Sequence, residues 1–264
     1  MRDPGAVVVA LDFDGVLAPI VPDPDDARPA DGATEVLSRL AGVIGSLAIL
    51  TGRPAAFAAE RLGISRLAEE RSFEAGALLV LGHYGVERYD ASTGSVSADP
   101  VPAGVEEARV RVTALLAEGA ALAGCALEDK GRSVAVHARR AADPAAAFAT
   151  MRAVLLPLAE ELGLHAEPGR LVIELRPPGM DKGAALRTLV AERSARAVVY
   201  AGDDLGDIPA FEAVRDMRAQ GLVGYALVSA SDEEGALTHL ADLVLSGPDA
   251  VVAWLSELAD ALGR

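Results

Sequence analysis

The chain has 264 residues, of which 51% are hydrophobic and 24% are charged, so it is long enough for one large globular domain or two smaller ones. The formal net charge of −15 argues against binding to nucleic acid or to an anionic membrane, because both attract basic surfaces. The single cysteine, Cys125, excludes a disulfide within the chain and indicates a reducing, cytoplasmic location.

Short apolar runs alternate with helical patterns along most of the chain. The first run is interrupted by Asp12, which is not typical of a signal peptide or a membrane span. Strands are predicted at Ala6–Phe13, Leu47–Leu50, Leu78–Leu81, Val198–Ala201, Gly224–Val228 and Leu243–Leu245, and helices at Thr34–Leu40, Pro54–Leu62, Lys182–Glu192, Pro209–Arg218 and Asp249–Leu262. This alternation predicts an α/β fold with a mainly parallel sheet covered on both faces. An edge hairpin is predicted around Tyr89–Val96.

The order of elements changes between two proline-rich breaks at residues 99–102 and 177–179. Helices are predicted there at Val105–Glu118 and Pro144–Leu162, and strands at Cys125–Glu128, Arg132–Ala138, near His165 and at Leu171–Arg176. This αββαββ pattern predicts a small α+β domain at residues 103–178, inserted into an α/β core made of residues 1–102 and 179–264.

Aspartates follow two of the predicted strands at the points where these strands end. Asp12 and Asp14 follow the first strand, and strand residues two apart point to the same side. Asp203, Asp204 and Asp207 follow a later strand. Ligands of open α/β sheets bind at this edge, and carboxylates with no nearby histidine or cysteine favour Mg²⁺. The alternative is that each aspartate is a turn or helix-capping residue.

Two other segments carry groups that suit an anion. Pro54 fits the first position of a helix. The Thr51 hydroxyl and the amides of Gly52 and Arg53 then precede a helix N-terminus, which is a candidate phosphate site, with a plain helix start as the alternative. Lys182 opens another predicted helix, where a cation opposes the helix dipole. Nearby carboxylates and a phosphate would explain this lysine, and a solvated lysine is the alternative.

Together these groups suit phosphoryl transfer by covalent catalysis. One carboxylate attacks phosphorus and forms an aspartyl-phosphate. A carboxylate two residues further on can donate a proton to the leaving oxygen and later accept one from water. A lysine and Mg²⁺ neutralise the charge of the phosphoryl group.

Four motifs resemble those of the haloacid dehalogenase-like phosphatases. They are DFDGV at Asp12–Val16, Thr51, Lys182 and GDDLGD at Gly202–Asp207, in the order and spacing of that family. The resemblance implies that the hydroxyl of Thr51 and the amine of Lys182 hold the phosphate.

The same resemblance assigns roles to the aspartates. It implies that Asp12 is the nucleophile and Asp14 the acid/base. It further implies that Mg²⁺ binds Asp12, the backbone carbonyl of Asp14 and Asp203. Asp204 and Asp207 would be supporting carboxylates.

The inserted unit has one polar and one apolar face in its predicted sheet. The apolar face suits packing of the two helices. The polar face presents Glu128, Lys130, Ser133, His137, Glu174 and Arg176. Such groups form hydrogen bonds with sugar hydroxyls, and the alternative is the solvated face of an ordinary antiparallel sheet.

Three longer segments resemble the trehalose-6-phosphate phosphatases. They are LDFDGVLAPIVPDPDDARP from Leu11, EDKGRSVAVH from Glu128 and ELRPPGMDKG from Glu174, and the likeness runs from about Val7 to Phe211. The resemblance implies a Rossmann-like core with a cap that closes on substrate. It also implies that Glu128, Lys130 and Glu174 bind the hydroxyls of the disaccharide.

The sequence therefore predicts a Mg²⁺-dependent phosphatase that releases trehalose from trehalose 6-phosphate. Other capped phosphatases, acting on sucrose phosphate or mannosylphosphoglycerate, are alternatives, as is a phosphomutase. A non-catalytic sugar-phosphate-binding protein is a further alternative, although such proteins usually lose a catalytic carboxylate. With no exposed apolar patch expected, we predict a monomer whose partner is a small sugar phosphate.

Overall fold

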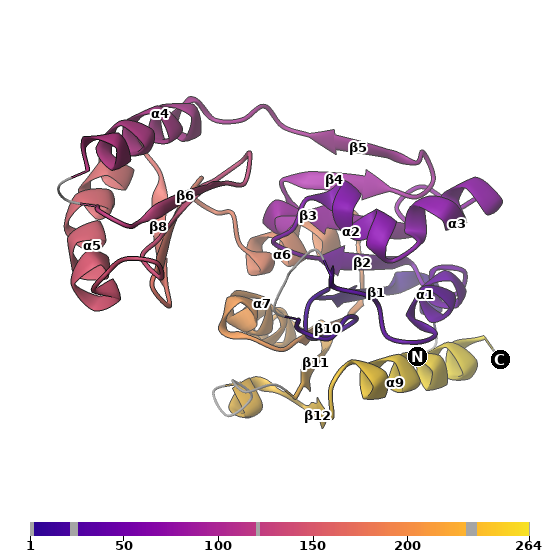
Figure 1. Cartoon of the computed structure of the whole chain (residues 1–264). Helices are drawn as coiled ribbons and strands as arrows, with labels where there is room; N and C mark the ends of the chain where they lie inside the picture. The colour runs from indigo at the N-terminus through magenta and orange to yellow at the C-terminus, as the bar shows by residue number, and fades with distance from the viewer. Residues whose placement is uncertain (1–2, 22–25, 120–121, 231–236, 264) are drawn as a thin grey trace. The chain divides into compact units, whose positions relative to one another are not determined.

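The computed structural model describes residues 3–21, 26–119, 122–230 and 237–263. The chain forms two compact units, one made of Met1–Ala98 and Asp181–Arg264 and the other of Asp99–Met180 (Figure 1). The sequence prediction put these boundaries at residues 102/103 and 178/179. Residues 22–25, part of the first segment that resembles the trehalose-6-phosphate phosphatases, lie outside the described residues.

The larger unit is built on an eight-stranded sheet in the order β12-β11-β10-β1-β2-β3-β4-β5. Its strands are β1 (Val7–Leu11), β2 (Ser46–Leu50), β3 (Leu78–Gly82), β4 (Glu87–Asp90), β5 (Ser95–Ala98), β10 (Ala197–Gly202), β11 (Val223–Ser229) and β12 (Leu243–Leu245). Neighbouring strands from β12 to β3 are parallel, and β4 and β5 add an antiparallel hairpin at one edge. The predicted α/β fold and edge hairpin are confirmed.

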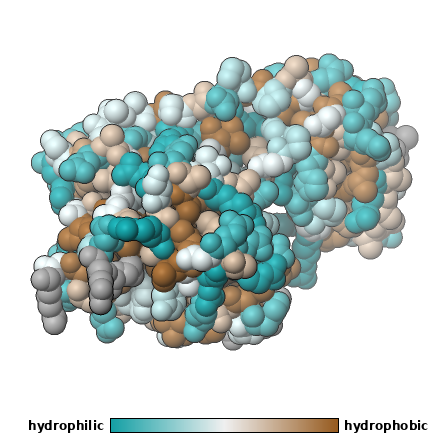
Figure 2. All heavy atoms as spheres, turned by 180° about the vertical axis from the view of Figure 1, so that it is seen from behind, coloured by the Kyte–Doolittle hydropathy of each residue, from teal (hydrophilic) through white to brown (hydrophobic). Residues whose placement is uncertain are grey.

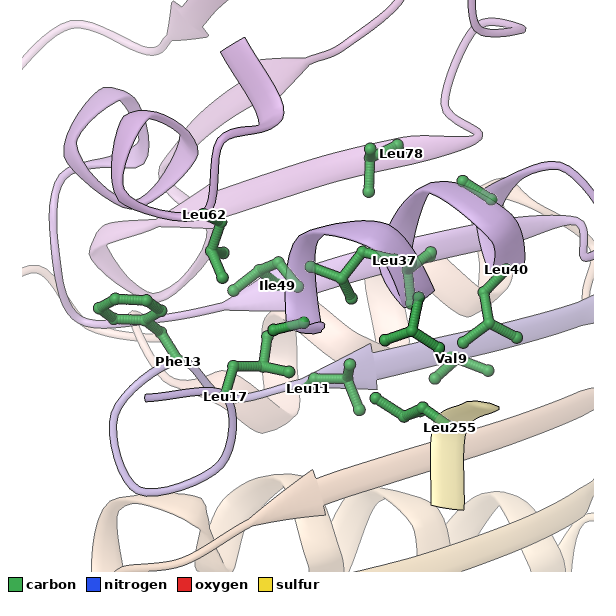
Figure 3. Close-up of a cluster of buried hydrophobic side chains, with 14 of the residues drawn as sticks. Val9, Leu11, Phe13, Leu17, Leu37, Leu40, Ile49, Leu62, Leu78 and Leu255 are labelled. Carbon is green, nitrogen blue, oxygen red and sulfur yellow. The ribbon is translucent and has the colours of Figure 1, made fainter. Parts of the chain in front are cut away.

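Helices cover both faces of this sheet (Figure 1). One face packs against α1 (Ala33–Ala41), α2 (Ala55–Arg61) and α9 (Pro248–Leu262), and the other against α6 (Lys182–Glu192) and α7 (Ile208–Ala219). Figure 3 shows side chains of the first face, where Val9 and Leu11 of β1 lie near Leu37 and Leu255. The alternate β1 residues belong to the core of the second face. Burial on both faces explains why β1 is apolar at every position.

One helix of the larger unit was not predicted. The sequence pattern gave a single helix ending at Leu62, whereas α2 is followed at once by α3 (Ile64–Glu70). Gly63 separates the two helices with a left-handed φ of 69°. Because glycine adopts this conformation without steric cost, the chain changes direction there and starts a new helix.

The smaller unit has a four-stranded antiparallel sheet in the order β6-β7-β9-β8. The strands are β6 (Ala126–Asp129), β7 (Val134–His137), β8 (His165–Gly169) and β9 (Val172–Arg176), and the helices are α4 (Ala103–Glu118) and α5 (Pro144–Glu161). Val134, Val136 and Ile173 are buried in one core with Val112 of α4 and Leu155 of α5. The predicted αββαββ order and the apolar face that carries the helices are confirmed.

Large apolar side chains are exposed at one edge of the larger sheet, which the sequence did not predict. Val223 and Tyr225 of β11 and Leu243 and Val244 of β12 are all at least 40% exposed. On the face drawn in Figure 2, hydrophobic and hydrophilic residues are interspersed. Among the described helices, none is both long and apolar enough to cross a membrane.

Candidate active site

The two aspartates near the N-terminus lie beyond β1 and not within it. β1 ends at Leu11, whereas the sequence predicted a strand to Phe13, so this prediction is wrong at its end. The chain turns immediately afterwards, with Gly15 at a φ of 72°. The orientation of the Asp12 and Asp14 carboxylates is therefore set by this turn, and not by alternation along a strand.

Gly15 lets the turn pack directly against a second aspartate loop. A Cβ atom at Gly15 would lie only 2.1 Å from the carboxylate of Asp203, so no side chain fits there. The carbonyl of Gly15 accepts a hydrogen bond of 2.6 Å from the hydroxyl of Ser229, at the end of β11. These contacts bring the carboxyl ends of β1, β10 and β11 together.

Among the residues that the structure describes, four carboxylates converge at this edge of the sheet. Each of Asp12, Asp203, Asp204 and Asp207 offers one oxygen, and these oxygens lie within 4.8 Å of one another. Burial, with repulsion from Asp204 and Asp207, raises the pKa of Asp203 to about 8. A hard divalent cation would relieve this repulsion, and oxygen donors are the ligands that Mg²⁺ prefers. The donor set therefore fits Mg²⁺.

Lys182 lies against this cluster. Its Nζ is 2.6 Å from Oδ2 of Asp12 and 2.6 Å from Oδ1 of Asp207. Burial lowers the pKa of Lys182, but attraction by these two carboxylates outweighs burial and raises it well above the ordinary value. Burial raises the pKa of Asp12, against the attraction of Lys182. The neighbouring carboxylates explain why a lysine occupies the first turn of α6.

The Asp207 carboxylate fixes the positions of Lys182 and of the backbone at Asp203 and Asp204. Its Oδ1 accepts hydrogen bonds from Lys182 and from the hydroxyl of Tyr200 (2.6 and 2.5 Å), and its Oδ2 from the amides of Asp203 and Asp204 (2.8 and 3.2 Å). Both oxygens are thus occupied by donors. A Cβ atom at Gly202 would lie 2.4 Å from this carboxylate, so glycine is needed beside it.

Sequence reasoning missed two residues that hold the site, Tyr200 and Ser229. Each is a fully buried polar residue within an apolar strand, at the end near the carboxylates. A hydroxyl in a strand that is otherwise buried and apolar needs a hydrogen-bond partner, and this requirement was the available signal.

The segment from Thr51 to Pro54 is arranged differently from the prediction. Thr51 is buried at the end of β2, and its Oγ1 accepts a hydrogen bond of 3.1 Å from the amide of Arg53. Helix α2 begins at Ala55, after Pro54, and the Ala55 amide donates to Oε2 of Glu87 at 2.9 Å. The first amide of α2 therefore already donates to an anionic side chain, that of Glu87 in β4.

Gly52 packs closely against Tyr84, and the Arg53 side chain pairs with Asp14. A Cβ atom at Gly52 would lie 2.9 Å from the hydroxyl of Tyr84. The guanidinium of Arg53 binds the Asp14 carboxylate through two contacts, Nε to Oδ2 at 2.7 Å and Nη2 to Oδ1 at 2.6 Å. The structure thus places Asp14 on Arg53, and Asp14 is not among the four converging carboxylates.

The polar residues of the smaller unit form ion pairs on its sheet. Glu174 accepts hydrogen bonds from Lys130 (2.8 Å) and from Ser133 (2.6 Å). Burial raises the pKa of Glu174, but these two partners outweigh burial and the pKa is lowered. Glu128 contacts His137 at 2.7 Å. The three residues expected to bind sugar, Glu128, Lys130 and Glu174, therefore all have partners within the unit.

The sequence of this chain matches a known family over most of its length. Residues 10–242 match the family model described as trehalose-phosphatase. This chain belongs to the trehalose-phosphatase family. The matched residues include all the aspartates of the cluster and both Thr51 and Lys182.

Relatives of this trehalose-phosphatase family chain agree with the assignment. It is 32% identical over 262 residues to the trehalose-phosphate phosphatase of Mycolicibacterium paratuberculosis, covering 97% of this chain and 63% of that protein. The chain thus spans about three-fifths of the length of this relative.

Two solved structures share the fold. An Aspergillus fumigatus trehalose-6-phosphate phosphatase is 23% identical and matches 97% of this chain and 93% of its own, with a TM-score of 0.71. A haloacid dehalogenase-like hydrolase from Bacteroides thetaiotaomicron is 15% identical and matches 95% and 98% of the two chains, with a TM-score of 0.61. Members of the trehalose-phosphatase family and of the haloacid dehalogenase-like hydrolases therefore have this architecture.

Proposed function

We propose that this protein is a Mg²⁺-dependent phosphatase that hydrolyses trehalose 6-phosphate to trehalose and phosphate through an aspartyl-phosphate. The observation that carries the proposal is the 2.6 Å contact between Lys182 Nζ and Asp12 Oδ2 within the carboxylate cluster. Membership of the trehalose-phosphatase family and the names of the relatives support the choice of substrate.

In this proposal Asp12 is the nucleophile. Its carboxylate attacks phosphorus, and the oxygen–phosphorus bond to the sugar breaks as Asp14 gives a proton to the leaving oxygen. Asp14 then takes a proton from the water that attacks the aspartyl-phosphate. Lys182, the Thr51 hydroxyl and the Gly52 amide hold the phosphoryl oxygens.

The carboxylates would hold the cation. We assign Mg²⁺ to Asp12, Asp203 and the backbone carbonyl of Asp14, with Asp204 and Asp207 as supporting carboxylates. When bound, Mg²⁺ supplies positive charge that neutralises the phosphoryl group. Asp207 contributes by fixing Lys182 and the Asp203 amide, since donors already occupy both of its oxygens.

The two units would divide the work. We propose that residues 1–102 and 179–264 form the catalytic core and that residues 103–178 form the cap. Glu128, Lys130 and Glu174 of the cap would bind the sugar hydroxyls. Their charges, already held in ion pairs, suit hydroxyl groups better than a second anion.

The acidic chain and its single cysteine fit an enzyme of the cytoplasm that acts on a small molecule and not on nucleic acid. We retain a monomer in the proposal, because the exposed apolar residues of β11 and β12 are few. Other capped sugar phosphatases, acting on sucrose phosphate or mannosylphosphoglycerate, share the same core chemistry and differ only in what the cap binds.

Phosphate release from trehalose 6-phosphate, with and without Mg²⁺, tests the proposal. Wild type should release phosphate only with Mg²⁺, and Asp12→Asn should release at least about a thousandfold less, as expected for loss of a nucleophile. Sucrose phosphate, glucose 6-phosphate and mannosylphosphoglycerate should be poorer substrates. Equal release by Asp12→Asn and wild type would rule out the covalent mechanism.

A further inference from the structure

Two carboxylates lie two residues apart at the end of β1, yet only one of them joins the converging set. We propose that Arg53 is a positioning residue that holds the Asp14 carboxylate away from the cation site before substrate binds, so that Asp14 does not become a ligand of the cation. This inference rests on the proposed function, because it concerns the acid/base and the cation of that reaction.

The pairing of Asp14 with Arg53 has the geometry of a strong, oriented contact. Two guanidinium nitrogens meet the two carboxylate oxygens, at 2.7 and 2.6 Å. A two-point contact of this kind fixes the plane of the carboxylate as well as its position. A lysine in place of Arg53 would supply a charge without that fixed plane.

Arg53 is itself held on several sides. Its guanidinium lies 5.4 Å from the ring centre of Phe13 and 5.0 Å from that of Phe57, within the range of cation–π attraction. Its carbonyl accepts a hydrogen bond of 3.0 Å from the amide of His83. His83 has a φ of 46°, which is unusual for a residue other than glycine. The backbone turn that donates this hydrogen bond to Arg53 is therefore strained.

Asp14 nevertheless lies close to the cluster. The charge of Asp14 is near enough to contribute to the raised pKa of Asp203. Asp14 and Asp12 thus pair with different basic side chains, Asp14 with Arg53 and Asp12 with Lys182. The side chain of Asp14 is 35% exposed and that of Asp12 only 8%, which leaves Asp14 the one that water can reach.

The separate pairing of Asp12 and Asp14 matters for the proposed reaction. An oxygen bound to a cation is a poor proton acceptor, so an acid/base that became a metal ligand would lose its function. Asp12 needs only to attack phosphorus, and it can share the cation. Arg53 thereby gives the Asp14 carboxylate a different role from that of the Asp12 carboxylate.

A double-mutant cycle on the full chain tests the inference, with the dissociation constant of Mg²⁺ measured by calorimetry. In wild type, Asp14→Asn should change this constant by less than about twofold, because the carboxylate is on Arg53. In Arg53→Ala, the freed carboxylate should join the cation site. Asp14→Asn should then weaken Mg²⁺ binding by roughly three- to tenfold, within the coupling range of residues in contact.

The cycle separates coordination from simple charge effects. Removing the charge of Asp14 acts through space by a similar factor in both backgrounds, whereas coordination acts only when Arg53 is absent. Equal effects of Asp14→Asn in the two backgrounds would overturn the inference. Arg53→Lys should restore the wild-type behaviour in part. Because Arg53→Ala removes packing from two phenyl rings, the cycle is repeated with Arg53→Met, which keeps the apolar stem.

Arg218→Ala is the matched control. Arg218 also makes a two-point contact with a carboxylate, that of Asp242, at 3.0 Å and 3.0 Å, but it lies in the last turn of α7, at the end opposite Asp207. It should leave the dissociation constant of Mg²⁺ unchanged. Phosphate release is followed in the same samples. If wild type released no phosphate, the proposed function would fail, while the Mg²⁺ cycle would still report on Arg53.

Discussion

At Asp203, a buried carboxylate lies beside those of Asp204 and Asp207. Burial and repulsion raise its pKa to about 8, which means that its ionised form is disfavoured in the fold. A protein selected only for stability would not place a charge there. Under the proposed function, this carboxylate lowers stability because it serves as a ligand of the cation.

Replacing Asp203 by asparagine should stabilise the metal-free protein. At pH 7 the unfolded residue is ionised and the folded one is not, and the difference between pH 7 and the ordinary pKa of 3.8 sets an upper limit of about 4 kcal/mol. Urea unfolding of Asp203→Asn in a chelator should give a free energy of unfolding above wild type, and added Mg²⁺ should no longer raise it.

Asp216→Asn serves as the control for this prediction. Asp216 pairs with Arg187 on the surface, so its replacement should change the free energy of unfolding by less than about 1 kcal/mol. A metal-free Asp203→Asn protein less stable than wild type would contradict the account of the cluster.

The small sheet of β6, β7, β8 and β9 is stabilised on its polar face by side-chain pairs. Glu174 is the centre of these, since Lys130 and Ser133 each donate to one of its oxygens. These partners, against burial, lower the pKa of Glu174. Its contribution to stability is therefore present above the unfolded pKa of about 4.5 and is lost as the pH falls through the lower folded value.

Glu174→Gln should destabilise the protein in a pH-dependent manner. The loss in free energy of unfolding should be about 1 to 3 kcal/mol at pH 7, as for hydrogen bonds to a buried charge, and should shrink below pH 4. Urea unfolding at both pH values measures this. Glu161→Gln, which breaks an exposed pair with Arg111, is the control. A loss equal at pH 7 and pH 3.5 would contradict the assignment.

Elements whose pattern repeats along the chain were predictable from the sequence. Strands buried on both faces are largely apolar, so β1 and β10 were located to within two residues. The carboxylates at the strand ends were recognisable because several aspartates directly after a buried apolar strand are unusual. The end of β1 was not predictable, because it depends on the turn at Gly15 and on its contact with Asp203.

Side-chain pairs between distant segments could not be read from the sequence. Arg53 and Asp14 are 39 residues apart, and Glu87 meets the Ala55 amide across 32 residues. Neither pair has a local signal, because each residue alone has an ordinary surface or capping role. For this reason the segment before α2, which was predicted to bind an anion, has contacts that the sequence did not indicate.

At the scale of the whole molecule, the candidate catalytic residues and the candidate sugar-binding residues belong to different units. The carboxylate cluster and Lys182 belong to the larger unit, and the polar sheet belongs to the smaller one. Under the proposed function, changes in the smaller unit should affect substrates that carry a sugar and spare those that do not.

Glu128→Ala should distinguish these substrates. We expect kcat/KM for trehalose 6-phosphate to fall about tenfold or more, as for loss of a hydrogen bond to a charged group, and that for p-nitrophenyl phosphate to be unchanged. Glu167→Ala is the matched control, because Glu167 is an exposed acidic residue of the same sheet that pairs with Arg176. Equal losses on both substrates would mean that Glu128 has only a structural role.

In the proposed reaction, Asp12 forms a covalent bond to phosphorus. Rapid acid quenching during turnover of trehalose 6-phosphate with Mg²⁺, followed by mass spectrometry of the peptide that contains Asp12, measures this bond directly. We expect one phosphoryl group on Asp12 in wild type and none in Asp12→Asn. Phosphate release by wild type with no phosphoryl group on the protein, or with the group on another residue, would contradict it.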